Sequence, residues 1–261
     1  AENTLARAKE SKQNAEDNLK KAREDGFNNT ANAFLDLPSI ITGLQDMLFT
    51  NNRSLDSGGQ WSIDYYGSAA GKYKASQFKT DAAYKYQTAR ASYEKNFQDY
   101  KSTDRNSSDS AVESLINQTY ETAKNIAEAV KSANNLIQLY EDELAKVNIK
   151  PAALADTHLS TLNGYTGKTN THLLNLLSAK NTIENDKTAI TNSVRTIAES
   201  AESLAKLKSG ADTLDIESSQ LAVKQRENAL LDAKEKLDDY FIRAPFSGTI
   251  AKINVKKTDS I

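Results

Sequence analysis

The sequence contains no cysteine and only two histidines, His158 and His172. Without cysteine the chain can form no disulfide, no thiolate nucleophile and no thiolate metal site. Neither histidine has a ligand-like residue at the short spacing that transition-metal sites use, so we expect no metal site. We interpret both as histidines of solvated loops. The absence of cysteine also fits an extracytoplasmic protein, which must avoid stray oxidation.

Proline and glycine are scarce, with three prolines and ten glycines in 261 residues. So little punctuation over this length predicts long helices. The sequence has no Gly-rich phosphate loop and no nucleophile elbow between a strand and a helix. We therefore expect no catalytic residues and no cofactor.

Charge of one sign and long apolar runs are lacking as well. Lysine and arginine number 33 against 35 acidic residues, a net charge of −2. This balance, without a basic patch, gives no reason to expect binding to nucleic acid or to a lipid surface. No apolar run reaches the about 20 residues that cross a bilayer, and no part of residues 1–261 reads as a signal peptide, so we expect neither in this segment.

The two ends of the chain carry matching heptads. In residues 1–25 the seam positions are Leu5, Lys12 and Leu19, with Ala1, Ala8, Ala15 and Ala22 between them. Near the other end they are Ile216, Val223, Leu230 and Leu237. Large residues alternating with alanine allow two helices to approach closely. We predict an antiparallel coiled-coil hairpin formed by residues 1–26 and 212–240, with Asp212 as the N-cap of its second helix.

Residues 27–211 between these ends predict an inserted helical bundle. Pro38 should break or kink the first helix. We expect a loop at 50–62, a helix at 66–100 and a helix at 111–147, whose apolar residues alternate steps of four and three. Gly164 and Gly167 indicate a connector before a last long helix at 169–208. Long amphipathic helices joined by polar loops are typical of an antiparallel three- to four-helix bundle.

Aromatic residues gather between positions 61 and 100, where Tyr86, Tyr93 and Tyr100 are seven apart and Trp61 precedes them. One interpretation is a bundle core whose hydroxyls reach water. The other is a ligand-receptive aromatic wall, because Tyr and Trp give much contact area at little cost in entropy.

After residue 240 the pattern changes from helical to extended. Pro245 lacks an N–H and disfavours helix for the residue before it, and Gly248 supplies a turn. Residues 249–255 then alternate with period two, as a half-buried strand does. We predict a short β segment at 241–261.

The run Ile242, Arg243, Ala244, Pro245, Phe246 and Gly248, behind a coiled-coil helix, resembles the closing half of the lipoyl-like domain of membrane fusion proteins, the periplasmic adaptors of the hemolysin-secretion (HlyD) type. One departure is that Thr258-Asp259 stands where the family usually has Gly-Asp. The resemblance implies a fold that is mainly α, with an antiparallel coiled-coil hairpin, an inserted bundle and half of a lipoyl-like domain. Ala244-Pro245-Phe246 offers no lysine for attachment of a lipoyl or biotinyl group.

The resemblance also implies a function. Such adaptors are not enzymes; they oligomerise and couple an inner-membrane transporter, of the ABC or RND type, to an exit path from the periplasm. We find no convincing copy of the Arg/Leu/Ser motif that docks many adaptors on an outer-membrane channel, so that partner is not expected. Because the chain begins in helix, without an opening half of the lipoyl-like domain, we expect a piece of a longer, membrane-anchored protein.

Two alternatives from other classes remain open. The bundle could be a ligand-sensing extracytoplasmic domain that regulates a transporter. The chain could also be a purely structural coiled-coil protein, in which case the Ile242–Gly248 run is coincidence.

Overall fold

The computed structural model describes residues 1–52, 55, 59–241, 243, 246–254 and 256–257, with 72–74 described by backbone alone. Its helices are α1 (Glu2–Phe49), α2 (Ser62–Ala69), α3 (Lys72–Ser102), α4 (Asp109–Lys146), α5 (Ala153–Ser209) and α6 (Thr213–Asp239). The chain divides into two units, one of Glu2–Glu199 and one of Ser200–Ile261 with Ala1. The mainly α fold that the sequence predicts is confirmed.

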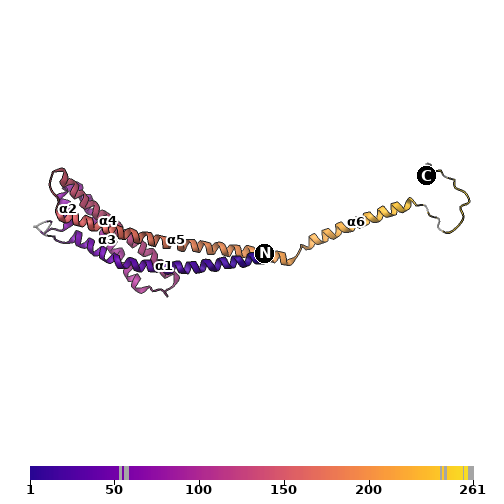
Figure 1. Cartoon of the computed structure of the whole chain (residues 1–261), viewed down its shortest axis with the longest axis horizontal. Coiled ribbons are helices and arrows are strands. Elements are labelled where there is room, and N and C mark those ends of the chain that lie inside the picture. Colours follow the sequence, from indigo (N-terminus) through magenta and orange to yellow (C-terminus); the bar gives the residue numbers. More distant parts are fainter. Residues whose placement is uncertain (53–54, 56–58, 242, 244–245, 255, 258–261) are drawn as a thin grey trace. The chain divides into compact units, whose positions relative to one another are not determined.

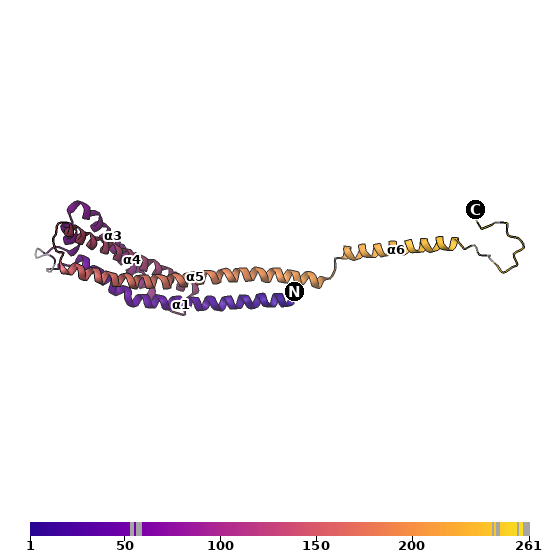
Figure 2. The same cartoon turned by 45° about the horizontal axis from the view of Figure 1, so that its top comes forward.

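In the first unit α1, α3, α4 and the first part of α5 lie side by side, and the short α2 packs on α1, α3 and α4 (Figures 1 and 2). Asn29 Nδ2 donates to the carbonyl oxygen of Asn175 at 3.4 Å, and Ser11 Oγ lies 3.4 Å from Ser193 Oγ. Positions along α1 rise as their partners along α5 fall, so these two helices run antiparallel.

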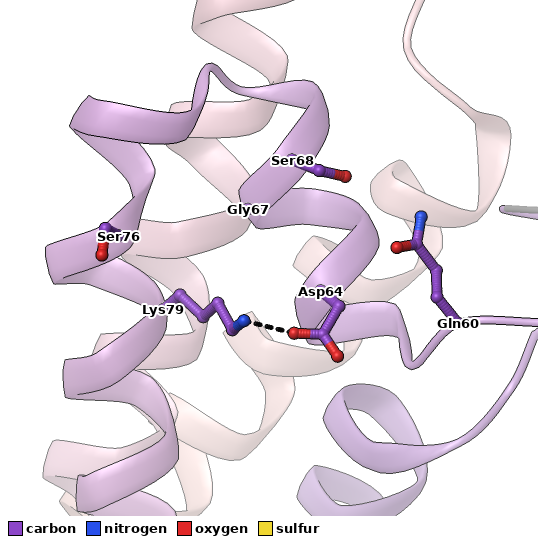
Figure 3. A pocket seen from close by; sticks show the side chains of 6 residues that line it. All are labelled: Gln60, Asp64, Gly67, Ser68, Ser76 and Lys79. Carbon is purple, nitrogen blue, oxygen red and sulfur yellow. Dashed lines mark ion pairs between the residues drawn. The ribbon is translucent and has the colours of Figure 1, made fainter.

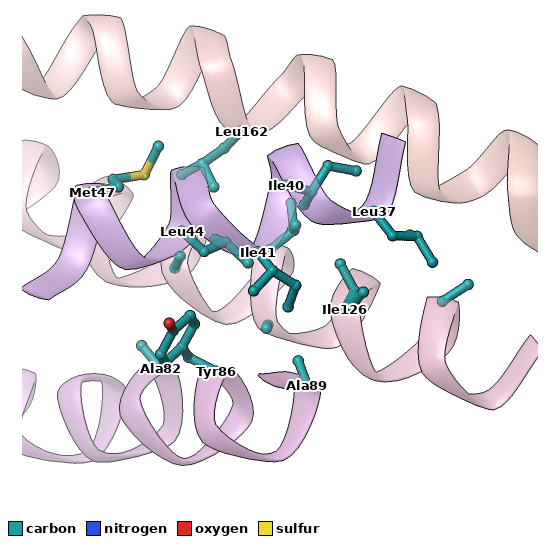
Figure 4. Packing of buried hydrophobic residues seen from close by; sticks show 14 of the residues in the cluster. Leu37, Ile40, Ile41, Leu44, Met47, Ala82, Tyr86, Ala89, Ile126 and Leu162 are labelled. Atoms are coloured by element: carbon teal, nitrogen blue, oxygen red, sulfur yellow. The ribbon is translucent and has the colours of Figure 1, made fainter. Parts of the chain in front are cut away.

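The core of this unit is aliphatic and receives side chains from every helix of the bundle (Figure 4). Leu37, Ile40 and Leu44 of α1 are fully buried, as are Ile126 of α4 and Leu162 of α5. Burying each such side chain contributes about 1.5–3 kcal/mol to folding. Two small buried residues of α3, Ala82 and Ala89, allow that helix to approach α1 and α4 closely.

The predicted seam of the fourth helix is confirmed. The structure buries most of its predicted members: Val112, Ile116, Thr119, Ala123, Ile126, Val130, Ala133, Ile137 and Tyr140. The last two positions differ, because Leu144 is half-buried and Val147 lies one residue beyond the helix and is exposed. Ser108 caps the first turn by accepting a hydrogen bond from the Ala111 N–H at 3.3 Å.

Pro38 does not break the first helix, so that prediction is wrong in its stronger form. α1 continues through Pro38 to Phe49. A proline inside a helix removes one backbone hydrogen bond and costs about 3 kcal/mol. Burial of Leu37 and Ile40 on either side offsets this cost, because both side chains lie in the shared core.

Two further boundaries differ from the prediction. The helix predicted at 66–100 is two helices, α2 and α3, separated at Gly71, whose φ of 91° is a left-handed conformation that glycine adopts at little cost. The connector predicted at Gly164 and Gly167 is instead part of a continuous α5. Leu162 and Thr169, on either side of these glycines, are buried against the bundle and hold the helix there.

The glycines of α1 and α5 should respond oppositely to alanine. Gly164→Ala and Gly167→Ala should each raise the free energy of unfolding by about 0.5–1 kcal/mol, since alanine is the better helix former and no atom lies within 4 Å of the added Cβ. Gly43→Ala should lower it, because its Cβ would clash with Tyr165 Oη and lie 2.8 Å from Cζ. Urea unfolding measures both effects; a stabilising Gly43→Ala would contradict the close approach of α1 and α5.

Part of the seam predicted at the beginning of α1 lies against α5. Ala8, Ala15 and Leu19 are buried, and this part of α1 contacts α5 through Ser11 and Ser193. Because α5 is not interrupted at its glycines, it extends along the beginning of α1. The predicted pairing of residues 1–26 with 212–240 stays a prediction, since α6 belongs to the second unit.

A charged cluster ties three helices of the first unit together. Arg23 of α1 donates from Nε to Glu113 at 2.8 Å and from Nη1 to Asp109 at 2.7 Å, both at the start of α4. Lys187 of α5 also donates to Glu113. Burial alone would raise the pKa of Glu113, but the hydrogen bonds from Lys187 and Arg23 outweigh it and hold the pKa below its ordinary range.

In the second unit α6 begins as predicted. Asp212 Oδ1 accepts a hydrogen bond from the Leu214 N–H at 2.9 Å, which confirms the N-cap. The described part of 241–261 contains no strand, so the predicted β segment is not confirmed. Phe246, Ile250 and Ile253 are exposed. An isolated two-stranded hairpin is marginal in water, because it has no core to bury such side chains.

Candidate functional site

Two of the aromatic residues considered as a ligand wall lie near the end of α1. Tyr86 is almost fully buried; its hydroxyl donates to Gln45 Oε1 at 3.1 Å, and its ring centroid is 5.0 Å from that of Phe49. Trp61 is 52% exposed and meets Phe49 edge-on at 5.9 Å. Tyr86 is therefore a core residue, and Trp61 covers the end of the core.

The other two aromatic residues also pack on α1. Tyr100 stacks on Phe34 with ring centroids 4.4 Å apart, and Tyr93 lies 6.1 Å from the same ring. Burial raises the pKa of Tyr93. These are the contacts of a bundle core, the first of the two interpretations. The second interpretation, a ligand-receptive aromatic wall, stays a prediction.

Both histidines lie on α5 rather than in solvated loops, so the loop interpretation is wrong. His158 Nδ1 is 2.8 Å from Tyr66 Oη, and His172 Nε2 is 2.9 Å from Asp36 Oδ2. Burial lowers the pKa of His158. Because the predicted connector is part of α5, His158 contacts α2 and His172 contacts α1. Across the described residues, no three His, Asp or Glu side chains gather to hold a metal ion.

A buried aromatic cluster joins α2, α4 and the start of α5. Tyr66 is fully buried, and its ring centroid lies 5.0 Å from that of Tyr140 and 6.0 Å from that of His158. Tyr140 Oη accepts a hydrogen bond from the Ala152 N–H at 3.0 Å, just before α5 begins. Burial raises the pKa of Tyr66 far above its ordinary range. The cluster therefore holds α2 against α4 and the start of α5, and the Tyr66 hydroxyl stays protonated.

The Asp36 carboxylate should make stability depend on acid pH. The hydrogen bonds that Asp36 accepts, first from Lys168 at 2.7 Å and then from His172, lower its pKa below the ordinary value of about 3.9. Because the folded pKa is depressed, this stabilisation is complete above about pH 4 and is lost as pH falls through the folded pKa. Asp36→Asn should lower the Tm at pH 7 and flatten the decrease of Tm below about pH 4.

Thermal unfolding followed by circular dichroism between pH 7 and pH 2 tests this expectation. Asp25→Asn, an exposed carboxylate of the same helix, is the matched control and should leave the profile unchanged. An Asp36→Asn profile as steep as that of the unchanged chain would contradict the role of Asp36.

A cleft of about 500 Å³ lies between α2 and α3 (Figure 3). Its charged members, Asp64 and Lys79, form an ion pair with each other, and the remaining lining is Gln60, Gly67, Ser68 and Ser76. The two charges neutralise each other, and none of the polar side chains in this lining is buried. The cleft therefore offers no evident chemistry.

The most distinctive surface of the second unit is α6. None of its residues, all of which the structure describes, is buried. Along one seam Ile216, Val223, Leu230 and Leu237 are between 45% and 58% exposed. An apolar seam at a spacing of seven is the pattern of a helix that packs on another helix. We refer to these four residues as the α6 seam.

The segment after α6 holds the run that resembles membrane fusion proteins. Of its members, Arg243, Phe246 and Gly248 are described and exposed, whereas Ile242, Ala244 and Pro245 lie outside the described residues. Within the described part of the chain, no helix combines the length and the apolar content needed to cross a bilayer.

Comparison with known proteins identifies no relative. No family model matches the chain, and neither a curated protein nor a solved structure gives a significant match.

Proposed function

We propose that this chain is an extracytoplasmic adaptor of the membrane fusion protein class, which couples an inner-membrane transporter to the export of a substrate. The observation that carries the proposal is the α6 seam, exposed on a capped helix and followed directly by the Ile242–Gly248 run. A regular, exposed apolar seam makes α6 a helix for partner contact, which is what an adaptor requires.

In this proposal the two units have separate roles. The bundle of Glu2–Glu199, with its filled core, is a stiff spacer. Residues 212–240 form one helix of a coiled-coil stalk, and residues 241–261 contribute to a lipoyl-like domain. The partner of the α6 seam is residues 1–26, a second copy of the chain, or a helix of the transporter assembly, and the test distinguishes these.

Site-specific photo-crosslinking from the seam is the direct test. A photoreactive residue replaces Val223, in cells that produce the protein naturally, and the products are identified by mass spectrometry. Gln225, two positions along and off the seam, is the matched control. We expect crosslinks from position 223, and not from 225, to residues 1–26, to another copy of the chain or to a transporter subunit.

Two outcomes would count against the adaptor function. If position 223 gives no crosslink to residues 1–26, to another copy of the chain or to a transporter subunit, then the α6 seam does not pack on a partner helix and the proposal loses its main support. Export that is unchanged when Val223 and Leu230 are both replaced by Asp would separate the seam from any transport role, because two charges at seam positions should prevent helix pairing.

A further inference from the structure

A second surface, on the outside of the bundle, has no role in the proposed adaptor. It is a groove of about 420 Å³ between α4 and α5. α4 contributes Lys124, Lys131 and Asn134 to its lining, and α5 contributes Asn163, Thr166 and Asn170.

Part of the polar lining is used by the fold, since Thr166 and Thr169 donate to backbone carbonyl oxygens of α5, but in the part of the chain that the structure describes its asparagines and lysines are not. Among the described residues, no hydrogen bond to the side chains of Asn134, Asn163 or Asn170 is present. No ion pair to Lys124 or Lys131 is present there either. The carboxylate of the described lining, Glu128, is neutralised by Lys85 of α3 at 2.6 Å. The groove therefore carries two unpaired positive charges beside free carboxamides.

Helix stability does not explain these residues. Asparagine in a helix interior is less favourable than alanine, because its side chain competes for backbone hydrogen bonds. Asn134, Asn163 and Asn170 lie well inside α4 and α5, where they cap nothing. No side-chain hydrogen bond within the described structure offsets the loss of helix stability that these asparagines cause.

The chemistry of the lining defines what it can recognise. Lys124 and Lys131 are seven residues apart on one helix, about 10.5 Å along its axis, and can attract two separate negative charges. Carboxamides both donate and accept, which suits hydroxyl groups. The described lining contains no large apolar side chain, and a peptide or helix partner would need such an anchor.

We propose that the groove between α4 and α5 binds an acidic saccharide, whose carboxylates pair with Lys124 and Lys131 and whose hydroxyls pair with Asn134, Asn163 and Asn170. The ammonium groups provide attraction, which salt weakens. The carboxamides provide selectivity for a polyhydroxylated chain over a simple anion. The site is independent of the α6 seam and stands whether or not the chain is an adaptor.

Titration calorimetry of the full chain with tetragalacturonate tests the proposal. Lys124→Gln/Lys131→Gln should weaken binding about tenfold, because both ion pairs to the saccharide carboxylates are lost. Asn163→Ala/Asn170→Ala should weaken it by about tenfold as well, through the loss of two hydrogen bonds. Alanine is the better helix former, so this variant keeps its fold.

Matched controls separate the groove from general charge. Lys95→Gln on α3 and Asn185→Ala on α5, both exposed and outside the groove, should leave binding unchanged. Maltotetraose, a neutral chain of equal length, should bind at least about tenfold more weakly than tetragalacturonate, because it cannot pair with either lysine.

Three results would overturn the proposal. The first is no heat of binding for tetragalacturonate at millimolar concentration. The second is equal weakening by the control and groove variants. The third is binding of a tetraglutamate peptide as tight as that of the saccharide, which would mean that the groove recognises charge alone.

Discussion

Replacing Ile126 by alanine should lower the free energy of unfolding of the bundle by about 2–5 kcal/mol. Ile126 is fully buried at the middle of α4, in the core that α1, α3 and α5 share. The variant loses the burial of its methyl and methylene groups, and packed helices cannot collapse fully into the space that remains. Urea and thermal unfolding of the variant and the unchanged chain measure the difference.

Exposed positions give the comparison for this result. Leu174 of α5 is 67% exposed, so Leu174→Ala should change stability by no more than about 0.5 kcal/mol. Ile137→Ala, at a second buried position of α4, should match Ile126→Ala. Equal stability of Ile126→Ala and Leu174→Ala would mean that the α4 seam is not the core.

Replacing Tyr66 by alanine should be as damaging, at about 3–5 kcal/mol. Tyr66 lies in the short helix α2 and packs on rings from α4 and α5. Its removal leaves a cavity the size of a ring where three helices meet. We expect cooperative unfolding at lower temperature, and weaker near-ultraviolet circular dichroism from the remaining tyrosines.

Tyr66→Phe isolates the hydrogen bond from the packing. It should cost about 0.5–1.5 kcal/mol, because the half-buried His158 loses the hydrogen bond between its Nδ1 and the Tyr66 hydroxyl. Tyr84→Ala, at an exposed tyrosine of α3, should have little effect. If Tyr66→Phe is as stable as the unchanged chain, then water replaces the hydroxyl and His158 is not held by Tyr66.

Regular patterns in the sequence predicted the elements that they cover. The alternating steps of four and three along α4 gave its buried residues from Val112 to Tyr140, because an unbroken periodicity specifies one face of a helix. Asp212 and the apolar series after it gave the bounds of α6. Both the periodicity of α4 and the N-cap of α6 are local features of the sequence. In α4, burial of the periodic residues in the bundle also stabilises the helix that they predict.

Single residues that usually end helices were poor guides. Pro38, Gly164 and Gly167 all lie inside continuous helices. Each costs about 1–3 kcal/mol within a helix, which the core on either side can outweigh. The sequence alone does not show at which proline or glycine the packing of the core will keep the helix continuous.

The hardest property to predict from the sequence was which helix each side chain contacts. Tyr86, Tyr93 and Tyr100 form a stripe in the sequence, but only the position of α1 shows that their rings pack against Phe34 and Phe49. The partners of His158 and His172 lie 92 and 136 positions away. The asparagines of the groove between α4 and α5 could not be picked out from the sequence, because they lie on two helices and follow neither the helical nor the strand periodicity.

The uneven burial along α1 has a consequence for how the bundle opens. From Ala33 to Leu48 the helix buries large aliphatic side chains, whereas from Ala8 to Ala22 it buries alanines and Leu19 alone. Ser11 and Ser193, which meet in this thinner region, are 182 positions apart in the chain, so once the two helices separate there, neighbouring sequence does not quickly bring them together again. Amide hydrogens should therefore exchange in a gradient, fastest near Glu2 and slowest near Leu44, as the α1–α5 pair unzips from Glu2 inward while the aliphatic core stays closed.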